Sequence, residues 1–254
     1  MIAGSPVIDF HGHVGRWDSV GMVDDADEML RQMDAVGIDR ACVFHIFHPD
    51  GRLGNEITTQ FVHRHPDRFI GFAYVSPLMA ETDVIAELER ALDNGMAAIK
   101  IYPPYTPCPL NHAAWDPIFG FADSRELVLI SHTDDGDFSK PEDLGRAARR
   151  FPRARFVSGH SGNVEPARSH AIGEAKRHPN FYLETCSTYR QPGVIERLVR
   201  EVGADRVLFG SDQPLMDPRA QLGKIITADL DDEEKRLVMG GNALRLLQLS
   251  DRLD

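Results

Sequence analysis

The sequence predicts one domain over residues 1–254, folded as a (β/α)8 barrel of the TIM type. Short apolar segments rich in β-branched residues recur along the whole chain, and segments with helical periodicity lie between them. The ends of eight such apolar segments follow one another at steps of about 30 residues, which is the size of a strand–helix–strand unit. An open, doubly wound sheet is the alternative, but the chain lacks the glycine-rich turn of the dinucleotide-binding folds.

Each predicted strand is bounded by a polar or turn-forming stretch, as expected for the buried strands of a parallel sheet. The helical segments are clearest over 24–37, 82–95 and 192–203, where apolar residues repeat on one face and a glycine follows the last turn. Thr82 is the expected cap of the second of these helices. The predicted strands end at His11, His45, Tyr74, Tyr102, His132, His160, Thr185 and Gly210.

The composition is that of a globular protein, with 42% hydrophobic residues and a formal net charge of −11. This charge argues against binding to nucleic acid or to an anionic membrane, because both require a basic surface. No apolar run approaches the roughly 20 residues of a membrane span, and the first residues do not resemble a secretory signal. The three cysteines form no paired motif, which predicts a cytoplasmic protein; Cys42 and Cys186 are expected to be small core residues.

The first predicted strand ends in two histidines, His11 and His13, separated by one glycine. Side chains two apart on a strand point to the same side, so these two imidazoles can bind one divalent cation. The chain also contains His63 and His65 with the same spacing, but they lie in a helical stretch, where residues two apart do not face each other. Only the first pair is therefore a candidate metal site.

Three further residues of the same chemistry follow later strands. His132 and His160 end the fifth and sixth predicted strands, and Asp212 follows the eighth. In a barrel, the carboxyl ends of all strands meet on one face, where active sites form. The sequence therefore predicts that these residues converge with His11 and His13.

Several motifs give the chain a resemblance to a known family. They are DFHGH at the first strand, RHPDRFIGFAYVSP around the third, AAIKIYP at the fourth, GHSGN at the sixth, FGSDQPL at the eighth and GGNALRLLQL near the end. With these motifs the chain resembles the amidohydrolase superfamily, and within it the amidohydrolase 2 branch, which includes decarboxylases of the aminocarboxymuconate semialdehyde type.

The resemblance implies that His11, His13, His132 and Asp212 hold one metal ion together with a water molecule. His160 is then the acid/base residue beside that water, and Asp212 relays protons while it remains a ligand. Three imidazoles and a carboxylate suit Zn²⁺ best, with Mn²⁺ or another divalent ion as the alternative.

Lys100 and a group of loop residues have weaker assignments. Some relatives carry a carboxylated lysine that bridges two metals at this strand, but Lys100 lies two residues before the strand end, so a structural role is expected. Tyr102 stands where many relatives have histidine. The candidates for contact with the substrate are Arg16, Trp17, Tyr105, Glu184 and Arg190.

Three functions fit these residues. The first expectation is a metal-dependent hydrolase, in which metal-activated water attacks an amide, a lactone or a similar carbonyl of a small molecule. The alternative is a non-oxidative decarboxylase of a small carboxylic acid, which uses the same metal site. A catalytically silent barrel is the third reading, but no ligand is missing from the set. A homodimer is an open expectation, since relatives are often dimers.

Overall fold

A computed structural model of the chain describes residues 5–18, 21–22, 25–46, 51–106, 108–187 and 191–249, with backbone alone at 81–82. Eight parallel strands form one sheet in the order β1 to β8, with each strand next to its neighbour in sequence. The strands are β1 (Ile8–His13), β2 (Arg40–Phe44), β3 (Phe69–Tyr74), β4 (Ala98–Ile101), β5 (Val128–His132), β6 (Arg155–Gly159), β7 (Phe181–Glu184) and β8 (Val207–Leu208).

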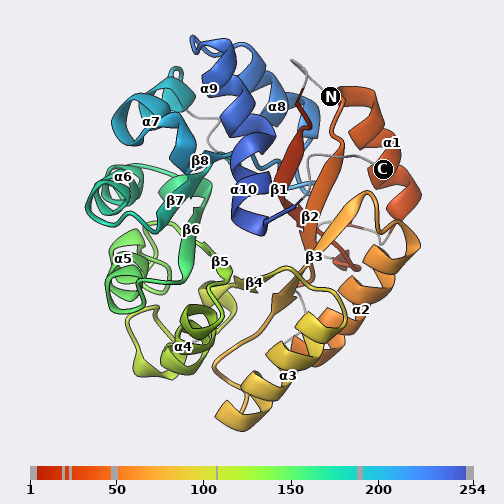
Figure 1. Cartoon of the computed structure of the whole chain (residues 1–254), viewed down its shortest axis with the longest axis vertical. Helices are drawn as coiled ribbons and strands as arrows, with labels where there is room; N and C mark the ends of the chain where they lie inside the picture. The colour runs from red at the N-terminus through yellow and green to blue at the C-terminus, as the bar shows by residue number, and fades with distance from the viewer. Residues whose placement is uncertain are drawn as a thin grey trace.

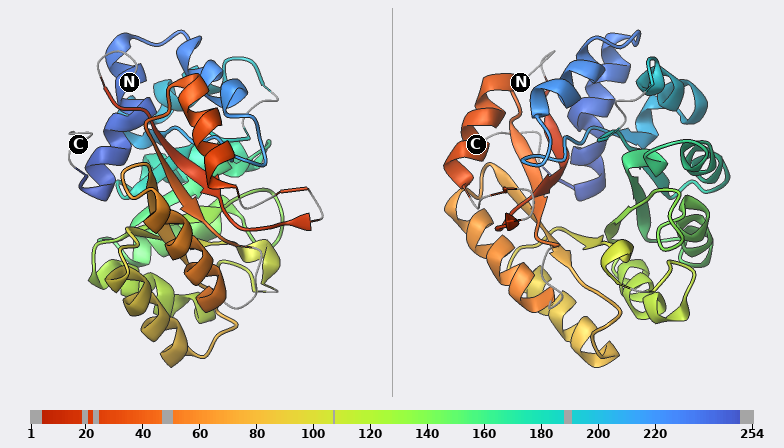
Figure 2. Two further views of the ribbon diagram at one scale, coloured as in Figure 1. Left: turned by 90° about the vertical axis from the view of Figure 1, so that its right-hand side faces the viewer. Right: turned by 180° about the vertical axis from the view of Figure 1, so that it is seen from behind.

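Helices surround the strands in chain order, so the colour runs once around the ring in Figure 1. Figure 2 shows α2 and α3 running alongside each other on the outer surface. The helices are α1 (Ala26–Val36), α2 (Gly51–Arg64), α3 (Glu81–Asp93), α4 (Asp116–Ser124), α5 (Pro141–Arg150), α6 (Ala167–Arg177), α7 (Val194–Val202), α8 (Pro218–Ile226), α9 (Asp232–Arg236) and α10 (Asn242–Leu247). The predicted (β/α)8 barrel is confirmed.

The ring of strands is closed between β1 and the segment that follows β8. Phe10 N donates to the carbonyl of Phe209 at 2.8 Å, and Asp212 N donates to that of His11 at 2.8 Å. His13 N donates to the carbonyl of Gln213 at 2.7 Å. These bonds hold the residues after β8 against the end of β1, so His11, His13 and Asp212 are neighbours although they are far apart in sequence.

The interior of the barrel is packed with aromatic side chains. The rings of Phe10 and Phe72 meet edge to face at 5.3 Å between centroids, and Phe44 and Phe72 stack at 6.1 Å. Ala243 and Leu244 of α10 join the same buried cluster, and Figure 1 shows α10 lying across one end of the barrel. Apolar packing therefore closes that end of the barrel. The buried polar side chains described below lie at the opposite end.

Helix boundaries follow local signals in the sequence, with one exception. Asp25 caps α1 by accepting a hydrogen bond from Glu28 N, and Gly37 ends this helix with a φ of 80°. The expected cap of the second predicted helical segment was wrong. That helix begins at Glu81, after Ala80, one residue before Thr82.

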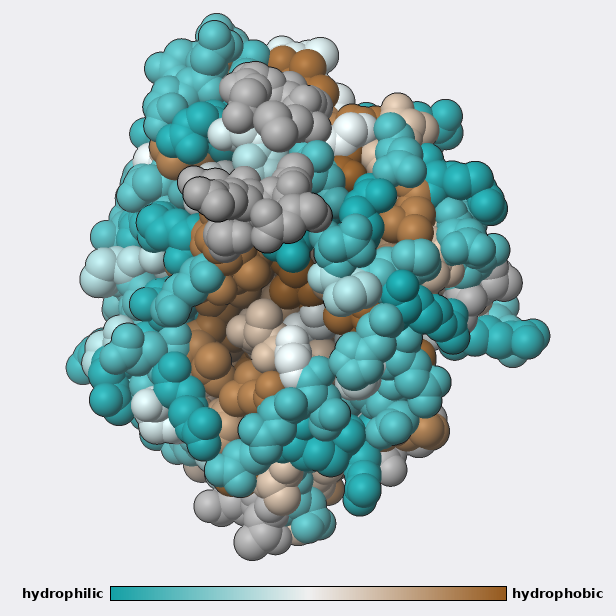
Figure 3. Space-filling view, turned by 45° about the vertical axis from the view of Figure 1, so that its right-hand side comes forward, coloured by the Kyte–Doolittle hydropathy of each residue, from teal (hydrophilic) through white to brown (hydrophobic). Residues whose placement is uncertain are grey.

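The surface is largely hydrophilic in the view of Figure 3, where hydrophobic residues line a hollow. None of the helices in the described part of the chain combines the length and the apolar character that a membrane span requires.

Gly240 is required by close packing beneath β1. A Cβ atom at this position would lie 2.0 Å from the carbonyl oxygen of Pro6. We expect Gly240→Ala to lower the free energy of unfolding by about 1–3 kcal/mol, because backbone has to move to admit the methyl group. The melting temperature, measured by calorimetry, should fall by roughly 2–4 °C for each kcal/mol in a chain of this size.

Gly223 provides the matched control for this change. It lies inside α8, and nothing stands within 4 Å of a Cβ added there. Gly223→Ala should raise the stability by roughly 0.5–1 kcal/mol, because alanine is the better helix former. Equal melting temperatures for the two variants would show that the close approach at Gly240 is not a constraint.

Candidate metal centre and catalytic site

His11, His13 and Asp212 form a buried cluster at the carboxyl end of the barrel. His13 Nε2 lies 2.8 Å from Asp212 Oδ1, and His11 Nε2 lies 3.6 Å from the same oxygen. One ligand atom from each of the three residues lies within 4.8 Å of the others. Two ligands bound at about 2.1 Å to one tetrahedral ion lie about 3.4 Å apart, so these separations fit a metal centre.

His132 lies at the edge of this cluster, and its ligand atoms fall outside the group of three. It ends β5, as predicted, and its ring centroid lies 4.6 Å from that of His160. His132 Nε2 is hydrogen-bonded to Asp134 at 3.0 Å, while its buried Nδ1 has no hydrogen-bond partner among the described residues. An unpartnered buried nitrogen is costly, and a metal ion would satisfy it. Nδ1 is therefore the atom that His132 can offer to a metal.

Burial sets the charge of the cluster. Burial lowers the pKa of His11 and of His160 well below the usual value, and it also lowers the pKa of His13. Burial alone would raise the pKa of Asp212, but the hydrogen bond from His13 and the neighbouring imidazoles outweigh it and hold this pKa well below its usual value. Neutral imidazoles beside an ionised carboxylate are the form in which these groups bind a metal.

Lys100 brings a positive charge close to the cluster. Its Nζ lies 3.2 Å from His11 Nε2 and 4.3 Å from the centroid of the Phe44 ring, and the side chain is fully buried. Burial lowers the pKa of Lys100 to about 8. This amine helps to keep the His11 ring uncharged, since its charge is the second cause of the lowered pKa of His11.

Asp9 anchors the segment that carries Asp212. Its carboxylate accepts hydrogen bonds from Ser211 N at 2.8 Å, from Gln213 Nε2 at 2.6 Å and from the Ser211 hydroxyl. These bonds hold the residues on both sides of Asp212, whose φ of 66° lies in the left-handed region. His160 also has a φ of 66°. Such backbone conformations persist where the surrounding contacts enforce them, and they are frequent in active sites.

Glu184 lies behind His11 and is fully buried. Its Oε2 accepts hydrogen bonds from His11 Nδ1 at 3.0 Å and from His160 N at 3.0 Å. A carboxylate on the outer nitrogen of a histidine fixes the ring and leaves the other nitrogen for a metal. The same carboxylate also accepts the backbone N–H of Cys186.

The other candidates for substrate contact are placed differently. Trp17 and Tyr105 meet edge to face at 6.4 Å, Tyr105 packs on Tyr102 at 4.4 Å, and Tyr102 packs on His132 at 4.8 Å. This aromatic row, Trp17–Tyr105–Tyr102, leads from the surface to the cluster. Arg16 instead pairs with Asp18, and both side chains are about three-quarters exposed (75% and 76%). Arg190 lies outside the described residues.

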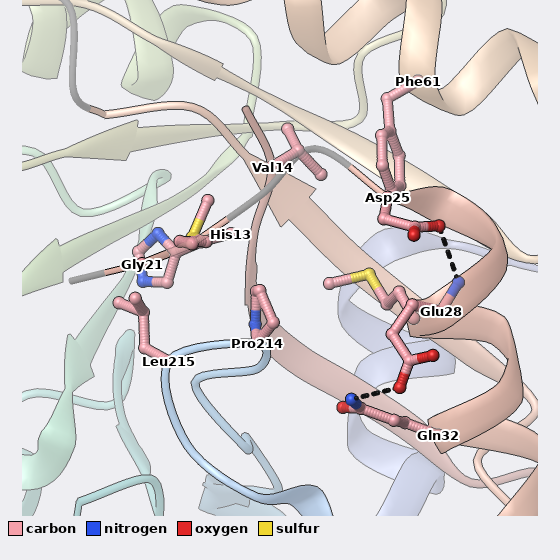
Figure 4. Close-up of a pocket in the computed structure, with 11 residues that line it drawn as sticks. His13, Val14, Gly21, Asp25, Glu28, Gln32, Phe61, Pro214 and Leu215 are labelled. Atoms are coloured by element: carbon pink, nitrogen blue, oxygen red, sulfur yellow. Dashed lines mark hydrogen bonds between the residues drawn. The ribbon is translucent and has the colours of Figure 1, made fainter. Parts of the chain in front are cut away.

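A cavity of about 230 Å³ lies beside His13, between α1, Phe61 of α2 and the segment after Asp212 (Figure 4). One side of the cavity is lined by apolar side chains and the other by polar ones. On the polar side, Glu28 N donates to Asp25 Oδ1 at 2.9 Å, and Gln32 Nε2 donates to Glu28 Oε1 at 3.0 Å. The volume is below the roughly 300–1,000 Å³ of pockets for drug-sized ligands, so this cavity suits a small molecule.

Residues 8–249 match the family model of the amidohydrolases of the amidohydrolase 2 type, so the chain belongs to this family of enzymes. Gamma-resorcylate decarboxylase from Polaromonas sp. (strain JS666 / ATCC BAA-500) is 22% identical over 303 residues, covering 90% of this chain and 89% of the relative.

Two solved structures share the fold. The 5-carboxyvanillate decarboxylase of Sphingomonas paucimobilis has a TM-score of 0.78 and 17% identity, and the match covers 97% of this chain and 100% of the other. The 5-carboxyvanillate decarboxylase of Novosphingobium aromaticivorans, complexed with manganese and 4-hydroxy-3-methoxy-5-nitrobenzoic acid, has a TM-score of 0.79 and 16% identity, with 98% and 97% covered.

Proposed function

We propose that this protein is a metal-dependent, non-oxidative decarboxylase of a small aromatic carboxylic acid. Hydrolysis of an amide or a lactone, the first expectation from the sequence, has less support, because the three relatives described above are decarboxylases. The observation that carries the proposal is the aromatic row that ends on His132. Flat rings along the way to the cluster suit a flat aromatic substrate, since offset and edge-to-face contacts stabilise ring pairs.

We assign the metal to His11, His13, His132 and Asp212. The contacts among His11, His13 and Asp212 support this ligand set, and so does Nδ1 of His132, which has no hydrogen-bond partner among the described residues. The relative complexed with manganese favours Mn²⁺, and the donor set equally suits Zn²⁺. When bound, the ion would polarise an oxygen of the substrate and stabilise the negative charge that develops there.

His160 is the proton donor in this proposal. Its ring lies between those of His11 and His132, with centroids at 4.9 and 4.6 Å. In decarboxylation the bond between the ring carbon and the carboxylate breaks, CO₂ leaves, and the electron pair on the carbon takes a proton. His160 gives this proton from Nε2 and takes another at Nδ1, so that the ring stays neutral, and solvent then restores the proton to the site. Asp212 is hydrogen-bonded to His13 in the absence of the ion, and both side chains would be ligands in its presence.

Glu184, which the sequence suggested for substrate contact, has a different role in this proposal. Because it is fully buried and accepts from His11 Nδ1, we assign it to orienting His11. Trp17 and Tyr105 are assigned to contact with the substrate ring, and Arg16 and Arg190 remain candidates for its carboxylate.

The test is turnover of gamma-resorcylate and of 5-carboxyvanillate by protein loaded with Mn²⁺ or with Zn²⁺. We expect release of CO₂, detected by mass spectrometry of the headspace, and its loss after treatment with a chelator. A panel of lactones and amides is run in parallel. Hydrolysis of one of these without CO₂ release from any aromatic acid would overturn the proposal in favour of a hydrolase.

A further inference from the structure

Cys186 lies two residues beyond the end of β7 and is fully buried, as its apolar surroundings in the sequence predicted. Its surroundings are nevertheless not those of a core residue. Its Sγ lies 2.9 Å from His160 Nδ1, 3.0 Å from Glu184 Oε2 and 3.4 Å from His11 Nδ1. The thiol therefore contacts the proposed proton donor and the carboxylate that orients His11.

The protons of this group can be assigned from its donors and acceptors. An ionised carboxylate only accepts, so His11 Nδ1, at 3.0 Å from Glu184 Oε2, carries a proton. The same Oε2 also accepts from His160 N at 3.0 Å. The thiol has one proton and two possible acceptors, Glu184 Oε2 and His160 Nδ1.

His160 Nδ1 is the acceptor that needs this proton. Glu184 Oε2 already has two N–H donors, whereas Cys186 is the one hydrogen-bond partner of His160 Nδ1 among the described residues. A thiol that donates to Nδ1 leaves the proton of the neutral imidazole on Nε2. His160 is 5% exposed, and no hydrogen bond from the described residues reaches its Nε2. Nε2 is therefore the nitrogen left for the substrate.

We propose that Cys186 is a positioning residue that fixes His160 in the tautomer with the proton on Nε2, so that the ring meets the substrate as a proton donor. As the proton on Nε2 passes to carbon, Nδ1 takes the thiol proton, and a proton from solvent restores the thiol. This inference rests on the proposed function, because a decarboxylase must deliver a proton to carbon, whereas a hydrolase first needs a base. The reverse arrangement, with Nδ1–H donating to sulfur, would present an unprotonated Nε2 and a base.

The tautomer can be measured without turnover. Protein labelled with ¹⁵N-histidine is compared with and without Zn²⁺, and long-range ¹H–¹⁵N correlations distinguish a protonated from an unprotonated ring nitrogen. The His160 signals are assigned from their absence in His160→Gln. We expect Nε2–H in the wild type and in Cys186→Ser, which keeps a donor, and a shift toward Nδ1–H in Cys186→Ala. Cys42→Ala, a change at another fully buried cysteine, is the matched control and should leave His160 unchanged.

Nδ1–H in the wild type would overturn the inference whatever the variants do, and so would an unchanged His160 spectrum in folded Cys186→Ala. If CO₂ is released, kcat should fall roughly 10- to 100-fold in Cys186→Ala with KM little changed, and Cys186→Ser should restore it. If no CO₂ is released while the tautomer follows Cys186 as expected, the proposed function fails and the positioning role of Cys186 stands.

Discussion

Asp212→Asn is expected to abolish tight metal binding and, with it, CO₂ release. The change removes the negative charge of Asp212, whose Oδ1 lies 3.6 Å from His11 Nε2 and 2.8 Å from His13 Nε2. It keeps the shape of the side chain. Asparagine also tolerates the left-handed backbone at this position, so the fold should persist. We expect the affinity for Mn²⁺, measured by titration calorimetry, to fall by more than about 100-fold. This loss exceeds the roughly 10- to 100-fold that follows when a residue that only hydrogen-bonds to a metal ligand is removed.

Asp217→Asn is the matched control for this result. Asp217 lies five residues further along the chain and caps α8 by accepting from Arg219 N, a role in which asparagine is equivalent. This variant should bind Mn²⁺ and release CO₂ as the wild type does. Wild-type affinity in Asp212→Asn would remove Asp212 from the ligand set.

His160→Gln is expected to have the second large effect, on turnover and not on metal binding. Positioned acids contribute about 10²- to 10⁴-fold to a rate, so kcat for CO₂ release should fall by that factor. The affinity for Mn²⁺ should stay within about threefold of the wild type, since His160 is not in the proposed ligand set. Steady-state kinetics and metal titration on the same preparation measure both quantities.

His63→Gln serves as the comparison for this variant, because His63 lies exposed at the end of α2. It should match the wild type in both assays. Substantial turnover in His160→Gln would assign the proton transfer to another residue, and loss of the metal from this variant would make His160 a ligand.

The fold could be predicted from the sequence because each strand is a short apolar segment with a polar or turn-forming residue at its end or within two residues after it. β5 ends at His132 and β3 at Tyr74, as predicted, and β8 ends at Leu208, two residues before the predicted Gly210. The proximity of His11 and His13 to Asp212 could also be predicted, since a barrel brings the carboxyl ends of all strands to one face.

The supporting contacts could not be predicted in this way, because they depend on which buried side chains meet across strands. Asp9 was part of the DFHGH motif, but nothing in the sequence pairs it with Ser211 and Gln213. Cys186 falls in an apolar run, which indicates burial and not contact with His160. Asp134 follows His132 by two residues, and only the turn after β5 brings its carboxylate back to that ring.

The single-metal site is tested most directly by the metal content of the purified protein, determined by elemental mass spectrometry before and after incubation with Mn²⁺ or Zn²⁺. We expect one equivalent of a divalent ion per chain, and a loss of that equivalent in the His11→Ala/His13→Ala variant. Two equivalents would contradict the single-metal site and point to a bridging, carboxylated Lys100. No bound metal after incubation with either ion would contradict the metal centre itself.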